Sequence, residues 1–184
     1  MSKNKRKWNS EKMLSISAMS ISFLTLVIFI YQTNLLSKQN YLSILPYLAI
    51  TTTYNKAEDN FELNIENHGV GPAIIESVRV SYQGEKEDLE KYNYSTIAYL
   101  QAKKPNLDSL VHLSHSTIDR GMAIPPNTKF NVVSVRNSPA DYELIIAELG
   151  RLMEEGLVFE VTYKSIQNER WRIHSNSMEP EELD

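Results

Sequence analysis

Residues 13–37 read MLSISAMSISFLTLVIFIYQTNLLS and contain no charged side chain. A helix of about 20 mostly apolar residues crosses the ~30 Å hydrocarbon core of a bilayer. Twelve Leu, Ile, Phe or Val residues lie between Leu14 and Leu36. Together they favour insertion by about 4–7 kcal/mol. The stretch predicts one transmembrane helix over residues 13–36 and divides the chain into an anchor and the part that follows it.

A cleaved signal peptide also begins with basic residues and an apolar stretch. This stretch is longer than the roughly 7–15-residue apolar core of such a peptide. The residues that close it, 31–37 (YQTNLLS), contain no small-x-small cleavage site. We therefore expect a retained signal anchor and a single-pass membrane protein.

Basic residues are concentrated before the apolar stretch. They are Lys3, Lys5, Arg6, Lys7 and Lys12. After the stretch, only Lys38 follows closely, and the next basic residue is Lys56. Cytoplasmic flanks of membrane helices are enriched in Lys and Arg. The N-terminus is therefore expected inside the cytoplasmic (inner) membrane and the following domain outside it.

Small and hydroxyl residues recur along one stripe of the predicted helix, at Ser15, Ala18, Ser22 and Thr25. Spacings of three and four residues keep them on one face. Such residues let membrane helices approach closely and hydrogen-bond. One interpretation is a contact with a helix of a protein partner or of a second copy. The other is that the hydroxyls bond to carbonyls of their own helix.

The charge balance of the 184-residue chain limits its partners. Beyond residue 12 the chain holds 14 basic and 22 acidic residues, a balance of −8. Nucleic-acid binding depends on Lys and Arg that neutralise phosphates, so no nucleic acid is expected as a partner. The chain has no cysteine, which excludes disulfides, thiol nucleophiles and cysteine–metal sites. No motif indicates a cofactor.

The remainder of the chain is dominated by short strand-like segments. They are residues 47–54, 61–66, 73–82, 107–118, 129–135, 157–164 and 170–174. Most alternate apolar and polar residues, the first is rich in β-branched and aromatic residues, and residues 107–118 are ambiguous but are read as a strand. Turn residues between 61–66 and 73–82, and at 165–169, predict two hairpins. The pattern predicts a mainly-β fold, an antiparallel, immunoglobulin-like β-sandwich of about seven strands with two inserted helices.

The two inserted helices have different signals. Helical spacing of apolar residues predicts the first over residues 85–101. Ser138 as N-cap, Pro139 in the first turn and Gly156 as the stop predict the second. The expected organisation is a basic cytoplasmic tail (1–12), the transmembrane helix (13–36), a juxtamembrane helix or linker (37–45), a β-sandwich domain (46–175) and an acidic disordered tail (176–184).

Residues 67–73 have the form N-x-G-x-G-P-A between two predicted strands. With Gln39-Asn40, Pro46-Tyr47-Leu48 and the closing pair around Tyr163 and Trp171, the chain resembles uncharacterised bacterial single-span membrane proteins. Those proteins carry a small β-sandwich domain with such a hairpin. The resemblance implies a sandwich on a bacterial membrane anchor and supplies no activity. Asn67, Gly69, Gly71 and Pro72 are expected to form a structural turn, with Gly71 in a conformation that bulkier residues resist.

The most polar stretch, residues 108–119, contains His112 and His115. Two histidines three residues apart share a face on a helix and could there bind a metal ion. On a strand they point to opposite faces. Because we predict a strand here, no catalytic and no metal-binding residue is expected.

Taken together, these features favour a membrane-anchored, non-enzymatic interaction or scaffold module. Its small β-sandwich would stand at the outer side of a bacterial cytoplasmic membrane and contact a protein partner there. Two alternatives stay open. One is a membrane-tethered sensor or effector subunit with its domain in the cytoplasm. The other is a membrane-bound hydrolase that uses His112 and His115 with a nearby acid.

Overall fold

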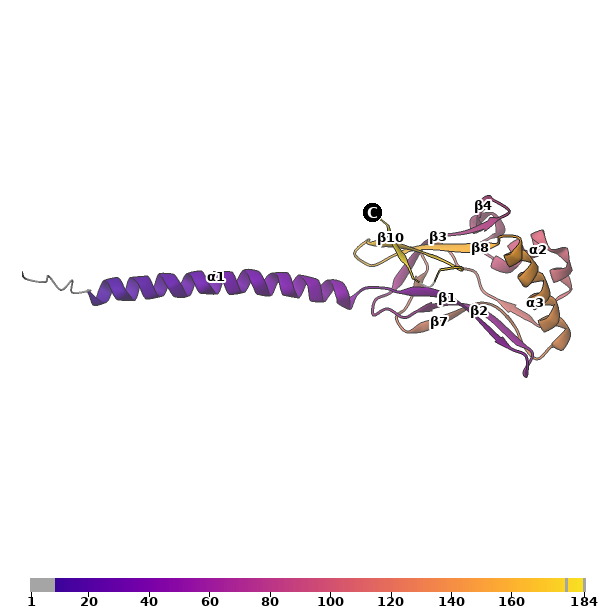
Figure 1. Ribbon diagram of the computed structural model, residues 1–184, viewed down its shortest axis with the longest axis horizontal. Coiled ribbons are helices and arrows are strands. Elements are labelled where there is room, and N and C mark those ends of the chain that lie inside the picture. Colours follow the sequence, from indigo (N-terminus) through magenta and orange to yellow (C-terminus); the bar gives the residue numbers. More distant parts are fainter. Residues whose placement is uncertain (1–8, 178, 184) are drawn as a thin grey trace, which may run out of the picture. The chain divides into compact units, whose positions relative to one another are not determined.

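The structure is a computed structural model that describes residues 9–177 and 179–183 (Figure 1). The chain divides after Leu42 into two units, a single helix and a β-rich domain. Most of the basic tail expected over residues 1–12 lies outside the described residues.

Helix α1 spans Ser10–Ser43, a length of 34 residues. At a rise of 1.5 Å per residue it is about 51 Å long, which exceeds the ~30 Å core of a bilayer. None of its residues is buried. As the uncharged stretch predicts, α1 is long and apolar enough to cross a membrane. It also continues without a break through most of the segment expected as a juxtamembrane helix or linker.

Four antiparallel strands form the first sheet, in the order β1-β2-β7-β5. Their bounds are β1 (Leu48–Asn55), β2 (Asn60–Asn67), β7 (Thr128–Val135) and β5 (Leu113–His115). A turn over residues 56–59 joins β1 and β2 with Asn55 opposite Asn60. β7 returns from the second half of the chain to pair with the other side of β2.

The second sheet has the order β10-β9-β8-β3-β4, and β6 pairs with the first residues of β3. Its strands are β3 (Ala73–Tyr82), β4 (Glu85–Asp88), β6 (Ala123–Ile124), β8 (Val158–Lys164), β9 (Arg170–His174) and β10 (Glu181–Leu183). β8 and β9 form the hairpin predicted around residues 165–169. The mainly-β, antiparallel prediction is confirmed, with ten strands among the described residues instead of about seven.

The hairpin predicted between residues 61–66 and 73–82 is wrong. β2 pairs with β1 and β7, whereas β3 pairs with β8, β4 and β6. Residues 68–72 therefore carry the chain from one sheet to the other. The error has a physical cause: alternation in a sequence fixes which face of a strand is buried, but not which strand lies beside it.

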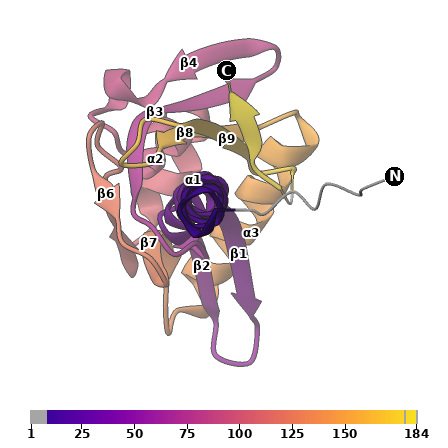
Figure 2. The same ribbon diagram turned by 90° about the vertical axis from the view of Figure 1, so that its left-hand side faces the viewer.

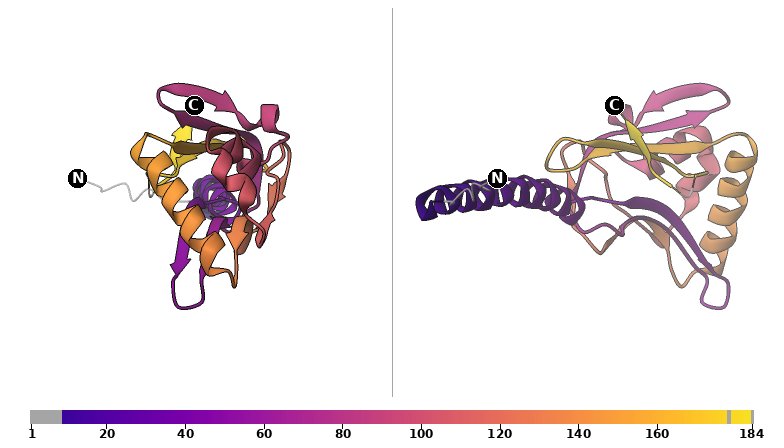
Figure 3. Two further views of the ribbon diagram at one scale, coloured as in Figure 1. Left: turned by 90° about the vertical axis from the view of Figure 1, so that its right-hand side faces the viewer. Right: turned by 60° about the vertical axis from the view of Figure 1, so that its left-hand side comes forward.

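The two sheets pack face to face and share one hydrophobic core (Figure 3). β2 contributes Phe61, Leu63 and Ile65, and β8 contributes Phe159, Val161 and Tyr163, all of them buried. These residues alternate along each strand, so one face of each sheet is inside. Helices α2 (Thr96–Lys103) and α3 (Pro139–Glu154) cover one end of the sandwich and add apolar side chains to the same core.

The helix predicted over residues 85–101 forms only in part. Glu85–Asp88 is strand β4, Leu89–Tyr92 is the 3-10 helix η1, and α2 spans Thr96–Lys103. Two caps cause the interruption. The Asp88 carboxylate accepts from the Glu90 N–H at 3.0 Å, and the Ser95 hydroxyl accepts from the Ala98 N–H at 3.3 Å. Each capping residue is extended and so starts a new element.

The strand predicted over residues 107–118 is also largely wrong. Pro105–Ser109 is the 3-10 helix η2, and only Leu113–His115 pair with β7 as β5. Helix α3 (Pro139–Glu154) confirms the second helix prediction, because Ser138 caps it and Gly156 follows with a φ of 91°. At the acidic end, expected to be disordered, Glu181–Leu183 pair with β9. An ion pair accompanies this pairing, since the Glu181 carboxylate lies 3.8 Å from the Arg172 guanidinium.

Tyr163 ties the two sheets together at the start of the domain. Its hydroxyl accepts a hydrogen bond from the Leu48 N–H at 3.3 Å, and its ring stacks on Trp171 at 5.8 Å between centroids. Burial raises the pKa of Tyr163 to about 12. The folded domain therefore favours the neutral phenol over the phenolate.

Replacing the buried phenol tests this tie. We expect Tyr163→Phe to lower the free energy of unfolding by about 1–3 kcal/mol, because the Leu48 N–H loses its partner. Denaturant unfolding of the full chain in detergent measures the loss. Tyr54→Phe is the control, since Tyr54 is half-exposed and its hydroxyl makes no hydrogen bond within the described residues. Equal stabilities of the two variants would contradict the role of the phenol.

The raised pKa also predicts a dependence on pH. Folding raises the pKa of Tyr163 from its ordinary value of 10 to about 12. The neutral phenol therefore contributes stability that is fully present below pH 10 and is lost as the pH rises toward 12. The wild-type chain should therefore lose stability over this range. The loss should be smaller in Tyr163→Phe.

Candidate functional site

The loop between β2 and β3 is built around the side chain of Asn67, which is buried. Its Oδ1 accepts from the N–H groups of Tyr47 at 3.2 Å and Gly69 at 3.0 Å. Its Nδ2 donates to the carbonyls of Gly71 at 2.9 Å and Ile124 at 3.0 Å. One amide thus satisfies four backbone groups from three separate segments, which uses its full set of two donors and two lone pairs.

The backbone of the same loop holds the first residues of the domain. The N–H groups of Val70 and Gly71 both donate to the Leu45 carbonyl, at 3.0 and 3.3 Å. The His68 N–H donates to the Tyr47 carbonyl at 2.8 Å. Residues 44–47 therefore lie along the loop before β1 begins. We call this assembly of residues 44–47 and 67–72 the entry clamp.

The two glycines of the clamp are needed for close approach of two backbones. A Cβ on Gly69 would lie 2.4 Å from the Leu45 carbonyl oxygen, and one on Gly71 would lie 1.8 Å from the Ile44 oxygen. Neither glycine has a positive φ. The expectation that Gly71 supplies an unusual conformation is therefore wrong, and its role is to leave space for Ile44. Pro72 follows directly and leads into β3.

The entry clamp holds the segment that follows helix α1. Helix α1 ends at Ser43, and the clamp takes hold of the chain from Ile44 onward. Ile44, which follows α1, lies against Gly71, and Leu45 and Tyr47 are hydrogen-bonded to the loop that joins the two sheets. Any displacement of residues 44–47 must break several backbone hydrogen bonds in a partly buried site.

His112 and His115 are placed differently by the structure. His115 lies in β5, whereas His112 precedes that strand and contacts Asp141 in the first turn of α3. The Asp141 carboxylate accepts from the His112 N–H at 2.8 Å and the Val111 N–H at 3.3 Å, and the His112 Nδ1 lies 3.1 Å from it. Asp141 is nearly buried, whereas most of the His112 ring is exposed. The two histidines are thus not brought together with this acid.

A hollow of 450 Å³ adjoins His112 and is lined by Ser114, Ser116 and Arg136 among others. A histidine oriented by an aspartate beside serines invites comparison with a catalytic triad. Such a triad needs the serine hydroxyl within hydrogen-bond reach of the imidazole. No serine in the described residues makes that bond to His112. The contacts instead describe a carboxylate that fastens the segment before β5 to α3.

The predicted helix-contact residues of α1 have internal partners. The hydroxyls of Ser15, Ser22 and Thr25 donate to the carbonyls four residues earlier, at 2.9, 2.9 and 2.8 Å. Such bonds satisfy the hydroxyls in lipid and still leave Ala18 and the serines small enough for a second helix to approach. The helix contact therefore stays a prediction.

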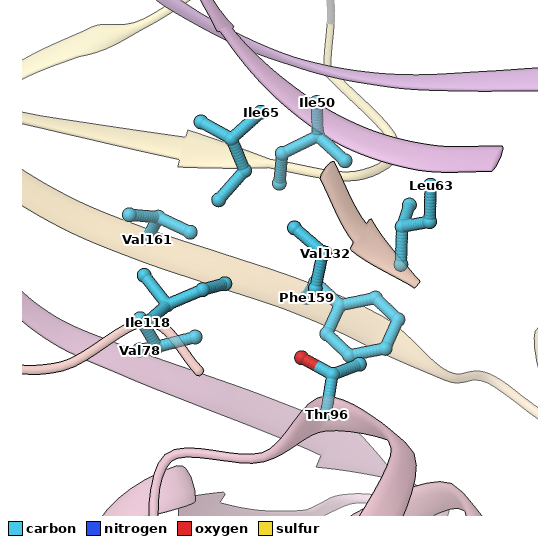
Figure 4. Close-up of a pocket in the computed structure, with 9 residues that line it drawn as sticks. All are labelled: Ile50, Leu63, Ile65, Val78, Thr96, Ile118, Val132, Phe159 and Val161. Atoms are coloured by element: carbon cyan, nitrogen blue, oxygen red, sulfur yellow. The ribbon is translucent and has the colours of Figure 1, made fainter. Parts of the chain in front are cut away.

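A small apolar cavity lies between the sheets (Figure 4). Its lining includes Ile50 and Leu63 from one sheet and Phe159 from the other, and Thr96 supplies a hydroxyl. Its volume is 10 Å³, at the lower limit of what one water molecule needs. The cavity is a small packing gap and does not offer a ligand site.

A charged network covers the outer face of the second sheet. Glu160 is buried at its centre, with the Lys86 ammonium at 2.7 Å and groups of Arg79, Arg172 and His174 at 3.8–3.9 Å. Burial raises the pKa of Glu160, but its neighbouring cations outweigh this and lower it overall. The network links β4, β3, β8 and β9. In the described part of the chain, no group of three or more His, Asp or Glu is arranged to hold a metal ion.

Comparison with known proteins adds no family to these observations. No family model, curated protein or solved structure matches the chain.

The close approach at the clamp can be tested with two glycines of this chain. We expect Gly71→Ala to destabilise the domain by about 3 kcal/mol or more, because its methyl group would overlap the Ile44 backbone. The matched control is Gly150→Ala in α3, where a Cβ meets nothing within 4 Å. That change should stabilise the helix by about 0.5–1 kcal/mol. Thermal unfolding of both variants measures the contrast. Similar melting temperatures would contradict the clamp.

The role of Asp141 leads to a test in acid. Burial raises the pKa of the Asp141 carboxyl, but hydrogen bonds from His112 and Val111 outweigh it and leave the pKa below its ordinary value. A carboxyl whose pKa is lowered by folding stabilises the domain at pH values above its ordinary pKa, near 4. This contribution is lost as the pH falls below that value and the carboxylate is protonated. Asp141→Asn should therefore be less stable at pH 7 and lose less on acidification. Asp119→Asn, at an exposed position, should behave like wild type.

Proposed function

We propose that the chain is a membrane-anchored, non-enzymatic interaction or scaffold module. It presents a small β-sandwich domain at the outer side of a bacterial cytoplasmic membrane, where the domain contacts a protein partner. The observation that carries this proposal is the entry clamp, which takes hold of the chain one residue after the long apolar helix ends. The first residues of the domain are thereby held against the loop between β2 and β3.

The features of the helix support the anchor. α1 has no buried residue and includes the uncharged run from residue 13 to residue 37. A soluble domain would not keep so much apolar surface in water. Ser15, Ala18, Ser22 and Thr25 offer a face through which the helix joins a partner helix or a second copy.

The distribution of charge supports the orientation. Basic residues precede the helix, and the part of the chain beyond residue 12 has a balance of −8. Lys and Arg near a membrane helix favour the cytoplasmic side. The domain then lies outside the cell membrane and inside the envelope.

The arrangement of strands supports an immunoglobulin-like sandwich. Two antiparallel sheets share one core, and the chain passes from one sheet to the other at residues 68–72. Domains of that architecture commonly bind proteins through sheet faces, edges or end loops. The fold itself names no activity. The non-enzymatic reading rests on the absence of an assembled triad or metal cluster among the described residues.

The absence of cysteine gives a direct test of the orientation. A single cysteine at Gln167, an exposed position in the β8–β9 turn, is treated with a membrane-impermeant maleimide in intact cells. We expect labelling without lysis, because the domain is outside. The cysteine-free chain is the background control. Labelling only after lysis would overturn this orientation and favour the cytoplasmic sensor or effector subunit.

A further inference from the structure

The two sheets have four lateral edges, and three of them are poorly suited to pairing with another chain. β5 and β10 are three residues long, and β4 has four residues. β4 reads Glu-Lys-Glu-Asp and β10 reads Glu-Glu-Leu, so both also carry charge. Short strands and charged side chains are the usual devices that prevent edge-to-edge association.

β1 is the exception. It has eight residues, LAITTTYN, with no charge and no proline, and is rich in β-branched side chains. It pairs on one side with β2 along its whole length without a register shift. Figure 2 shows β1 as the outermost strand of its sheet. A long, uncharged and regular edge strand is the kind that accepts another strand.

The register of β1 determines which backbone groups face its free edge. The Tyr47 carbonyl points toward β2, because it accepts from the His68 N–H. The Leu48 N–H points away from β2, because it donates to the Tyr163 hydroxyl. Hydrogen-bonding direction alternates along a strand. The N–H and C=O groups of Ile50, Thr52 and Tyr54 therefore face outward, and none of them has a hydrogen-bond partner among the described residues.

We propose that this edge pairs with β1 of a second copy of the chain, antiparallel and centred on Thr52. In this register Thr52 faces Thr52 of the other copy, and Ile50 faces Tyr54. The three outward-facing residues of each copy then exchange all their N–H and C=O groups across the interface. The β1-β2-β7-β5 sheet of one copy and the same sheet of the other copy then form one continuous sheet.

The sequence of β1 suits a copy of itself better than a charged partner strand. Threonine pairs and aromatic–β-branched pairs are favourable neighbours across antiparallel strands. On the solvent face Thr51 would stand opposite Thr53, so no like charges meet. A two-fold interface must be self-complementary, and β1 meets that requirement because it carries no charge that would face its own counterpart.

This inference rests on the proposed function in one respect, because it names the partner of the anchored module. Its test does not depend on the side of the membrane on which the domain lies. The full chain carrying Thr52→Cys is exposed in isolated membranes to a membrane-permeant oxidant. Hydrogen-bonded antiparallel pairs have Cα atoms about 5.5 Å apart, within disulfide range.

Two single-cysteine controls separate pairing from chance encounter. In the proposed register Thr53 is diagonal to its counterpart, at about 7–8 Å, which is too far for an unstrained disulfide. Ser114 lies in β5, at the opposite edge of the same sheet. We expect Thr52→Cys to yield at least about tenfold more disulfide-linked dimer than Thr53→Cys or Ser114→Cys.

A charge variant tests the same edge without relying on distance alone. Thr51→Lys with Thr53→Lys, added to Thr52→Cys, sets lysines opposite one another and should remove the dimer. Thr51→Lys also removes the hydrogen bond that the Thr51 hydroxyl donates to the Glu66 carboxylate at 2.7 Å. Thr52→Cys with Thr51→Lys alone is therefore the matched control, and the circular dichroism of both variants should remain that of the parent. A dimer held only by the helices would not give this pattern.

Three results would overturn the inference. One is no dimer at Thr52. Another is an equal yield of dimer at all three cysteine positions. The third is a disulfide from Thr52→Cys to a different polypeptide, which would assign the edge to a foreign strand. The maleimide labelling at Gln167 is scored separately, so failure of the orientation and failure of the pairing give different results.

Discussion

The rest of the domain depends on the close contact between residues 44–47 and the loop that follows β2. At this point two backbones approach closely enough to exclude a Cβ on Gly69 or Gly71, and one buried amide satisfies four backbone groups. The contact fixes where β1 starts, and the same loop fixes where β3 starts in the opposite sheet. Since Ile124 joins the same amide, the short strand β6 is positioned by it as well. The starts of β1 and β3 and the position of β6 are thus all fixed by the entry clamp.

The sequence predicted individual strands and helices better than it predicted which strands lie side by side. The alternation in β2, β7, β8 and β9 and the capped start of α3 are written in contiguous residues, and the structure confirms them. Which strands lie side by side depends on contacts between distant residues, as when β7 joins β2. Three strands were missed, β4, β6 and β10, and all are short. β6 has only two residues. β4 and β10 are charged, and their pairing is stabilised by neighbours such as Arg79 and Arg172 that no local pattern indicates.

The candidate site shows the same division. The N-x-G-x-G-P-A pattern identified Asn67, Gly69 and Gly71 as structural residues, yet it gave no reason to connect them with residues 44–47, some 20 positions earlier. The contact between Asp141 and His112 spans 29 positions and was likewise invisible. A glycine in a sequence often marks a position where only the absence of a side chain is tolerated. Whether the reason is a turn or a close approach of two backbones depends on the segment that packs against it.

The clamp and the free edge of β1 are consecutive parts of one segment. In a freely diffusing protein an uncharged eight-residue edge invites uncontrolled association. In the proposed anchored dimer, attachment to a membrane would restrict the orientations in which two copies meet and raise their effective concentration. The clamp holds the chain up to Tyr47, and the Tyr163 hydroxyl occupies the Leu48 N–H, so the available edge begins only at Ile50. In the proposed dimer these two contacts limit the hydrogen-bonded pairing to Ile50, Thr52 and Tyr54 of each copy, which fixes one register.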